Sequence, residues 1–62
     1  MFTVGDKIKN VHTKNVSTIT KVEFEYICDK EVYETDEKDY KGGFIRFNSD
    51  YANNYKMVNG NQ

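Results

Sequence analysis

Polar and apolar residues alternate through residues 16–27, a stretch without glycine or proline in which β-branched and aromatic side chains predominate. These side chains favour strands. The even positions hold Val16, Thr18, Thr20, Val22, Phe24 and Tyr26, whereas most odd positions are polar or charged. This period of two predicts a strand whose even positions face a core. Ile19 and Ile27 break the alternation, which indicates a bulge or a bend in the strand.

Shorter segments of similar character flank this long strand, and residues that favour turns separate them. We expect strands at about 6–11, 16–27, 32–36, 43–48 and 55–58. The expected connections are Gly5-Asp6 before the first strand, a tight turn with left-handed Asn15, a hairpin loop at 28–31 and a hinge at Gly42-Gly43. Ser49 or Asp50 is a candidate N-cap for one helical turn before the last strand.

The number and length of these segments predict an all-β fold, a five-stranded and partly open SH3-like barrel with one short 3₁₀ turn before the last strand. The barrel occupies residues 1–58, and residues 59–62 are expected to form a frayed tail. A longer OB-like barrel is the alternative. The chain has 62 residues, which is the size of one small domain.

The N-terminal part of the chain carries a resemblance to a known family. The run Val4-Gly5-Asp6-Lys7-Ile8, a polar turn, and then Ser17-Thr18-Ile19 with Val22 resembles the opening of KOW-type and related SH3-like small barrels. The resemblance covers roughly residues 3–27, and the family pattern has glycine where this sequence has Ser17. The resemblance implies the barrel fold.

The inventory of reactive side chains argues against an enzyme. The chain has one histidine, His12, and one cysteine, Cys28, which we place in different loops. A zinc site needs about four such ligands, and the Gly-rich phosphate loop is missing. We therefore expect no catalytic residue, no metal site and no cofactor. We expect Cys28 to be at least half-buried and His12 to be exposed.

Composition also predicts where the protein acts. A single unpaired cysteine fits a reducing compartment, and no apolar stretch approaches the ~18 residues of a membrane span. We therefore expect a cytoplasmic protein that does not contact membranes. The bias towards Lys, Asn, Tyr and Ile is typical of small phage or mobile-element proteins, which would place it in the cytosol of the host.

Charge is unevenly distributed along the chain although the net charge is −1. Residues 1–22 carry +3, residues 23–39 carry −6 and residues 40–62 carry +2. The candidate partner-binding residues lie in or beside the acidic block: Glu23, Glu25, Glu31, Tyr33, Glu34, Asp36, Glu37, Asp39 and Tyr40. Tyrosine is a typical interface anchor and carboxylates attract basic surfaces. The leading hypothesis is a non-catalytic protein whose acidic hairpin binds a basic host protein, in its strongest form as a DNA mimic that inhibits it.

Three alternatives stay open. The acidic block is also what a solvated surface that keeps a small barrel soluble would contain. The lysines Lys7, Lys9, Lys14 and Lys21 are candidates for nucleic-acid binding by a KOW-like or SH3-like module. The protein is expected to be a monomer or a weak homo-oligomer, in which the basic N-terminal block of one copy meets the acidic hairpin of another and a small ligand fits between aromatic side chains.

Overall fold

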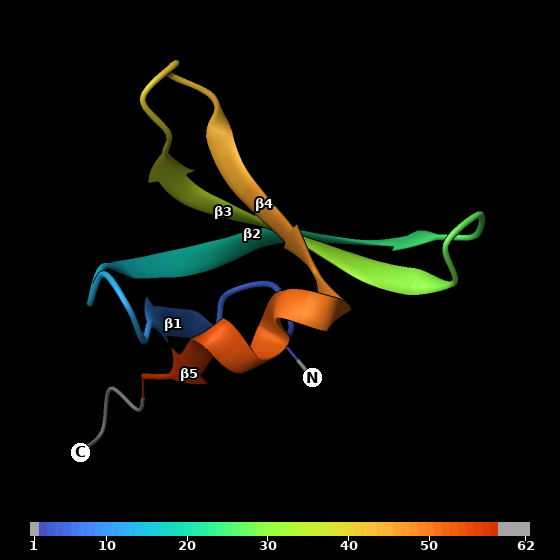
Figure 1. The fold of residues 1–62 in the computed structure, drawn as a ribbon, viewed down its shortest axis with the longest axis horizontal. Coiled ribbons are helices and arrows are strands. Elements are labelled where there is room, and N and C mark those ends of the chain that lie inside the picture. Colours follow the sequence, from blue (N-terminus) through green and yellow to red (C-terminus); the bar gives the residue numbers. More distant parts are fainter. Residues whose placement is uncertain (1, 59–62) are drawn as a thin grey trace.

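Five antiparallel strands form one twisted sheet in the computed structural model, which describes residues 2–58 (Figure 1). The elements are β1 (Lys7–Asn10), β2 (Val16–Glu25), β3 (Lys30–Lys38), β4 (Phe44–Asn48), the 3₁₀ helix η1 (Ser49–Asn54) and β5 (Tyr55–Met57). The all-β class, the five strands and the helical turn before the last strand are confirmed. The predicted tail at 59–62 lies outside the described residues.

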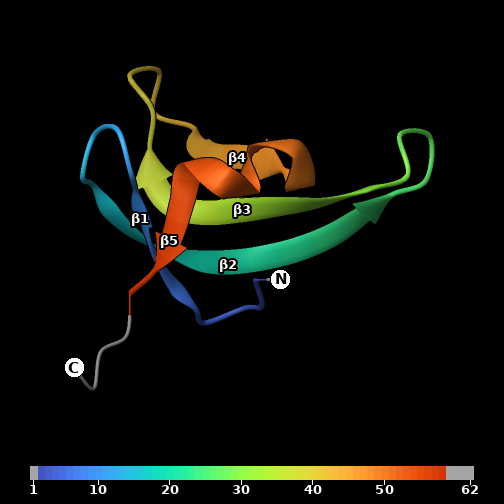
Figure 2. The same cartoon turned by 60° about the horizontal axis from the view of Figure 1, so that its bottom comes forward.

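The strand order is β4-β3-β2-β1-β5, so β4 and β5 are the two edges of the described sheet and the sheet is open. These edge strands are nevertheless consecutive in the chain, and only η1 separates them. The twist between neighbouring strands curls the sheet. The curl allows six residues to connect one edge with the other, and η1 lies against β3, β4 and β5 (Figure 2).

A bulge in the middle of β2 decides which side chains face the core. Ile19 pairs with Thr35 and Lys21 pairs with Glu34, so Thr20 is the additional residue. The hydroxyl of Thr20 donates to the Glu34 carbonyl oxygen at 3.2 Å. An extra residue reverses the alternation of faces, and odd positions therefore face inward before the bulge and even positions after it.

The predicted bulge at this point is confirmed, but the even-position core is correct only for the second half of β2. Ser17 and Ile19 are buried, whereas Val16 and Thr20 are exposed. Val22, beyond the bulge, packs against the core as expected. Ser17 faces inward because it pairs directly with the buried Ile8 of β1.

The core is a small aromatic and aliphatic cluster. Its buried apolar members are Phe2, Ile8, Ile19, Tyr33 and Phe47. The rings of Phe2 and Tyr33 meet edge to face at 5.3 Å, and Phe47 stacks on Tyr55 with 4.1 Å between ring centroids. The first segment, β3, β4 and the start of β5 are thereby held together without a disulfide.

Three turns differ from their predicted form. Lys14, and not Asn15, has the left-handed backbone conformation, with φ 69°. The hairpin turn is at residues 26–29 because β2 ends, and β3 begins, two residues earlier than expected. The side chain of Asn48 caps η1 by accepting from the Asp50 amide at 2.9 Å, so neither predicted cap residue has that role.

Candidate functional site

The β2–β3 hairpin extends beyond the rest of the sheet, and we call its residues 23–32 the hairpin arm (Figures 1 and 2). None of these ten residues is buried. The arm carries three large apolar side chains in water: Phe24 is 44 % exposed, Tyr26 85 % and Ile27 97 %. The rings of Phe24 and Tyr26 contact each other edge to face at 4.8 Å. The end of the arm is therefore an apolar tip.

Carboxylates surround this tip on both faces of the arm. Glu23 and Glu25 share the outer face, and Glu31 lies on the other face because it pairs with Phe24. Lys30, the one cation of the arm, forms a salt bridge with Asp50 of η1 and therefore does not neutralise these carboxylates. Cys28, in the turn, is exposed and not half-buried as expected. A hydrogen bond with the Glu25 carboxylate and its charge raise the pKa of the Cys28 thiol, which disfavours the reactive thiolate.

Basic side chains on the outer face of the sheet neutralise part of the acidic block. Arg46 lies 3.2 Å from the Glu23 carboxylate and 3.8 Å from that of Glu34, and Lys21 lies 3.2 Å from Glu23. The register places these side chains together because Lys21 and Arg46 both pair with Glu34. Glu23 and Glu34 therefore belong to a mixed-charge network and contribute little negative charge of their own.

Tyr33 was predicted to contact a partner and is instead at the centre of the core, with 0 % of its surface exposed. It pairs with Val22 after the bulge and therefore faces inward. Its hydroxyl donates to Glu31, which is thereby held against the body of the protein. Burial, with this hydrogen bond, raises the pKa of Tyr33 to about 12.

The remaining predicted acids lie at the far end of β3 and support the backbone. Asp36 accepts from the Thr18 amide at 2.9 Å, and Glu37 accepts from the Asn15 side chain at 3.0 Å. Asp39 accepts from the amides of the turn that leads into β4. Tyr40 is 93 % exposed there, with the Lys41 ammonium group 5.6 Å from the centre of its ring. The nine predicted residues therefore occupy both ends of β3 and two faces, and they do not form one patch.

The four lysines predicted to bind nucleic acid do not lie on one surface either. Lys7 and Lys9 share the outer face of β1, and Lys14 lies in the following turn, whereas Lys21 belongs to the network around Glu23. Lys56 of β5 pairs with Lys9 and joins this group. Sequence reasoning missed Lys56 because only the pairing of the first and last strands brings it to β1.

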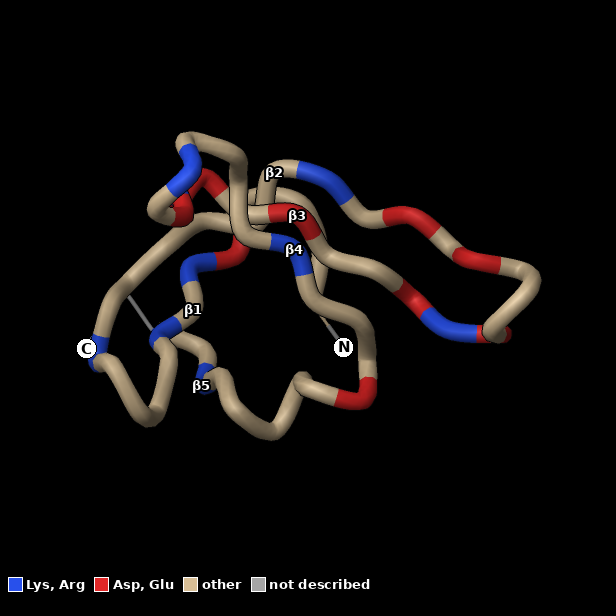
Figure 3. The backbone as a smooth tube through the Cα atoms, turned by 45° about the horizontal axis from the view of Figure 1, so that its top comes forward, with Lys and Arg blue, Asp and Glu red and all other residues tan. Residues whose placement is uncertain are grey.

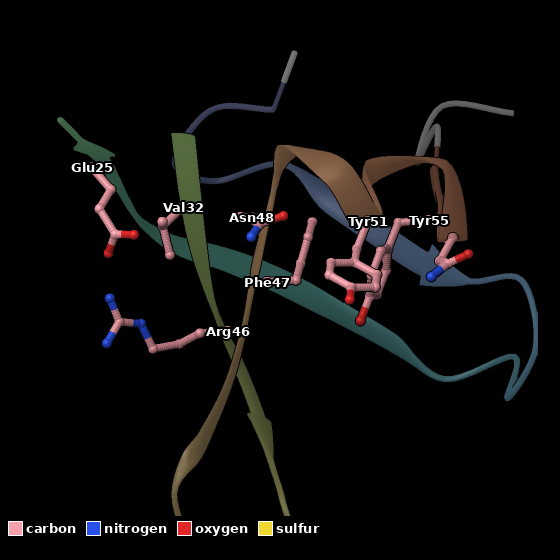
Figure 4. Close-up of a pocket in the computed structure, with 8 residues that line it drawn as sticks. Glu25, Val32, Arg46, Phe47, Asn48, Tyr51 and Tyr55 are labelled. Carbon is pink, nitrogen blue, oxygen red and sulfur yellow. The ribbon is translucent and has the colours of Figure 1, made fainter. Parts of the chain in front are cut away.

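A groove of about 560 Å³ lies between the arm, β4 and η1 (Figure 4). Its lining residues are Glu25, Val32, Arg46, Phe47, Asn48, Tyr51, Asn54 and Tyr55. In Figure 4 the side chains of Glu25 and Arg46 point toward one another across one end, and the tyrosines lie at the other. The groove mixes charged, amide and aromatic groups, and it adjoins the base of the arm.

Residues 2–58 contain no cluster of three or more metal-ligating side chains. Nor does that part of the chain form a helix of the length and apolarity needed to span a membrane. His12 lies exposed in the β1–β2 turn, as expected, and β2 separates it from Cys28. A regular strand of ten residues is about 33 Å long, so His12 and Cys28 lie beyond opposite ends of β2.

Comparison with known proteins found no match to the chain among protein-family models, curated proteins or solved structures.

Proposed function

We propose that this protein is a non-catalytic binding module whose hairpin arm docks into an apolar pocket with a basic rim on another protein. The observation that carries the proposal is the apolar tip, where Phe24, Tyr26 and Ile27 are exposed together at the end of a projecting hairpin. The sequence placed the partner-binding surface over the whole acidic block, and this proposal restricts it to the hairpin arm, residues 23–32.

The exposed apolar area supports a docking role in energetic terms. Complete burial of a side chain such as Ile27 contributes roughly 1.5–3 kcal/mol. Phe24 and Tyr26 contact each other and Ile27 follows Tyr26 in the chain, and a few such anchor residues typically supply most of the affinity at an interface. Tyrosine adds a hydroxyl that remains able to hydrogen-bond at the rim of a pocket.

Charge selects the kind of partner. Glu25 and Asp29 lie beside the tip, outside the network that neutralises Glu23, and the single cation of the arm, Lys30, is paired with Asp50 of η1. Asp29 has no salt-bridge partner within residues 2–58. A pocket rimmed by lysine or arginine would associate faster with this arm, whereas an anionic membrane surface would repel it.

The test compares an arm variant with a matched control. Tyr26→Ser with Ile27→Ser removes the two most exposed side chains of the tip, and Tyr40→Ser with Val4→Ser removes two exposed apolar residues elsewhere. A protein captured from lysate by the wild type is identified, purified and titrated with each form. We expect the arm variant to bind about tenfold more weakly or worse, a loss of ~1.4 kcal/mol, and the control to bind like the wild type.

A second variant tests the charge argument on the same purified partner. Glu25→Lys with Asp29→Lys is expected to slow association and to reduce its dependence on salt, since both acids lie beside the tip. Equal affinity of the wild type and the Tyr26→Ser/Ile27→Ser variant for every captured protein would refute the proposal.

A further inference from the structure

At the end of the sheet away from the arm, three lysines from separate segments converge. Lys9 of β1, Lys14 of the β1–β2 turn and Lys56 of β5 line a small pocket of about 120 Å³ together with Val11. We call these three lysines the basic surface, with Lys7 at its margin. Figure 3 shows blue segments at β1 and β5, while most of the red ones lie on the other strands.

The sheet register forces two of these charges together. Lys9 and Lys56 are direct partners in the β1–β5 ladder, so their side chains project from the same face of neighbouring strands. Like charges in directly opposite positions destabilise a strand pair. An anion bound between the two ammonium groups would replace this repulsion with attraction.

No carboxylate within residues 2–58 compensates these lysines. The structure pairs Lys21, Lys30 and Arg46 with acids at 4.0 Å or less, but not Lys9, Lys14 or Lys56. Two acids of β3 lie at the margin of this surface: Glu37 accepts from the side chain of Asn15, which follows Lys14, and Asp36 accepts from the Thr18 amide beside Lys7. The basic surface therefore keeps its charge although the whole chain is slightly acidic.

The turn that presents Lys14 is held by its own hydrogen bonds. The side chain of Asn10 accepts from the amides of His12 and Thr13 at 2.8 and 3.0 Å. The backbone amide of Lys14 donates to the Asn10 carbonyl oxygen at 2.8 Å. The ammonium group of Lys14 donates to the Val11 carbonyl oxygen at 3.0 Å. These contacts fix the third cation beside the other two before any ligand binds.

We propose that the basic surface binds the phosphate backbone of double-stranded nucleic acid without reading its sequence. Lysine ammonium groups recognise phosphate as point charges, and phosphate contacts position a protein without selecting a base sequence. The four lining residues include no aromatic ring. Recognition of single strands requires rings on which bases stack, and this absence therefore favours a duplex.

This site is separate from the site of the proposed function. The β1–β2 turn and the arm lie at opposite ends of the molecule (Figures 1 and 2). The two sites therefore leave room for a protein partner on the arm and a duplex on the basic surface at the same time.

The test measures binding of the whole chain to a labelled duplex DNA by fluorescence anisotropy over a range of salt concentrations. Each neutralised phosphate contributes about −0.9 to the slope of log K against log salt, so three lysines predict a slope of about −3. Lys9→Gln with Lys56→Gln should lower the magnitude of the slope by about 2 and the low-salt affinity by about tenfold or more.

A matched pair, Lys38→Gln with Lys41→Gln, makes the same change in net charge on exposed residues outside the basic surface. It should keep the slope and most of the affinity. The thermal midpoint of the Lys9→Gln/Lys56→Gln variant should equal or exceed that of the wild type, since a like-charge pair is removed. This readout separates a lost binding site from a damaged fold.

The proposal is overturned if no binding to duplex DNA is seen at low salt, or if both lysine pairs weaken binding equally. It is also overturned if the basic surface binds vesicles of anionic lipid, or a second copy of the chain in sedimentation experiments, but not DNA. The Tyr26→Ser/Ile27→Ser variant should bind DNA like the wild type, so failure of either proposal leaves the other testable.

Discussion

Tyr33 combines a buried ring with a polar group that must be satisfied. The ring contacts Phe2 and Phe47, and the hydroxyl reaches the edge of the core to donate to Glu31. A buried hydroxyl without a partner would cost roughly 1–3 kcal/mol. Glu31 therefore has a structural role, which explains why an acid inferred to bind a partner is directed towards the body of the protein.

This pair makes stability depend on alkaline pH. Burial raises the pKa of Tyr33 from its ordinary value of 10.0 to about 12. The folded state then holds the phenol proton more tightly than the unfolded state does. This contribution to stability is complete below pH 10 and is lost as the pH rises towards 12.

The Tyr33→Phe variant tests this dependence. At neutral pH it should lower the free energy of unfolding by about 1 kcal/mol, because the hydrogen bond to Glu31 is lost. Between pH 10 and about 12 the difference from the wild type should shrink, since the variant has no phenol to ionise. Urea unfolding at several pH values measures both. Tyr40→Phe, at an exposed position, is the control, and a difference independent of pH would contradict the prediction.

At the scale of elements, side-chain caps hold the connections between strands. Asp39 accepts from the Lys41 and Gly43 amides in the β3–β4 turn, at 2.8 and 3.0 Å. Asn48 has a similar role at the start of η1. Because η1 joins the two edges of an open sheet, its first turn determines whether β5 reaches β1.

The Asn48→Ala variant should therefore lose about 1 kcal/mol of stability. The cap hydrogen bond from the Asp50 amide is lost, while the backbone of Asn48 can still pair with Val32. Asn53→Ala, at an exposed position in η1, is the control and should change stability much less. Equal effects of the two changes in urea unfolding would show that the cap does not stabilise η1.

The whole molecule is divided into a packed body and an arm that the core does not support. The buried apolar residues lie outside residues 23–32. The arm is joined to the body by polar contacts such as those of Glu31 with Tyr33 and Lys30 with Asp50, and its backbone hydrogen bonds therefore open more readily than those beneath the aromatic cluster. Such a segment orders further when it docks, which fits the proposed role in binding.

Hydrogen exchange should detect this division. Amides of residues 23–25 and 30–32 are expected to exchange faster than those of Ile8, Ile19 and Tyr33, because opening the arm exposes little apolar surface. Protection in the arm should rise when the purified partner is added. Equal protection of arm and body in the free protein would contradict this view of the molecule.

The sequence by itself determined the strands and the fold class, because these depend on local properties. The alternation through 16–27 and the break at Ile19 predicted both a long strand and its bulge. The turn residues predicted five strands and the helical turn before the last. Boundaries shifted by one or two residues at most ends, where turn geometry competes with the strand pattern.

The tertiary structure alone decided which side chains act together. The position of the bulge placed Ser17 inward and Tyr33 in the core, because one extra residue exchanges the two faces of a strand. The pairing of β1 with β5 brought Lys56 to Lys9 across almost the whole chain. Such pairings depend on how a sheet curls and on long-range register, and no local pattern of residues encodes them.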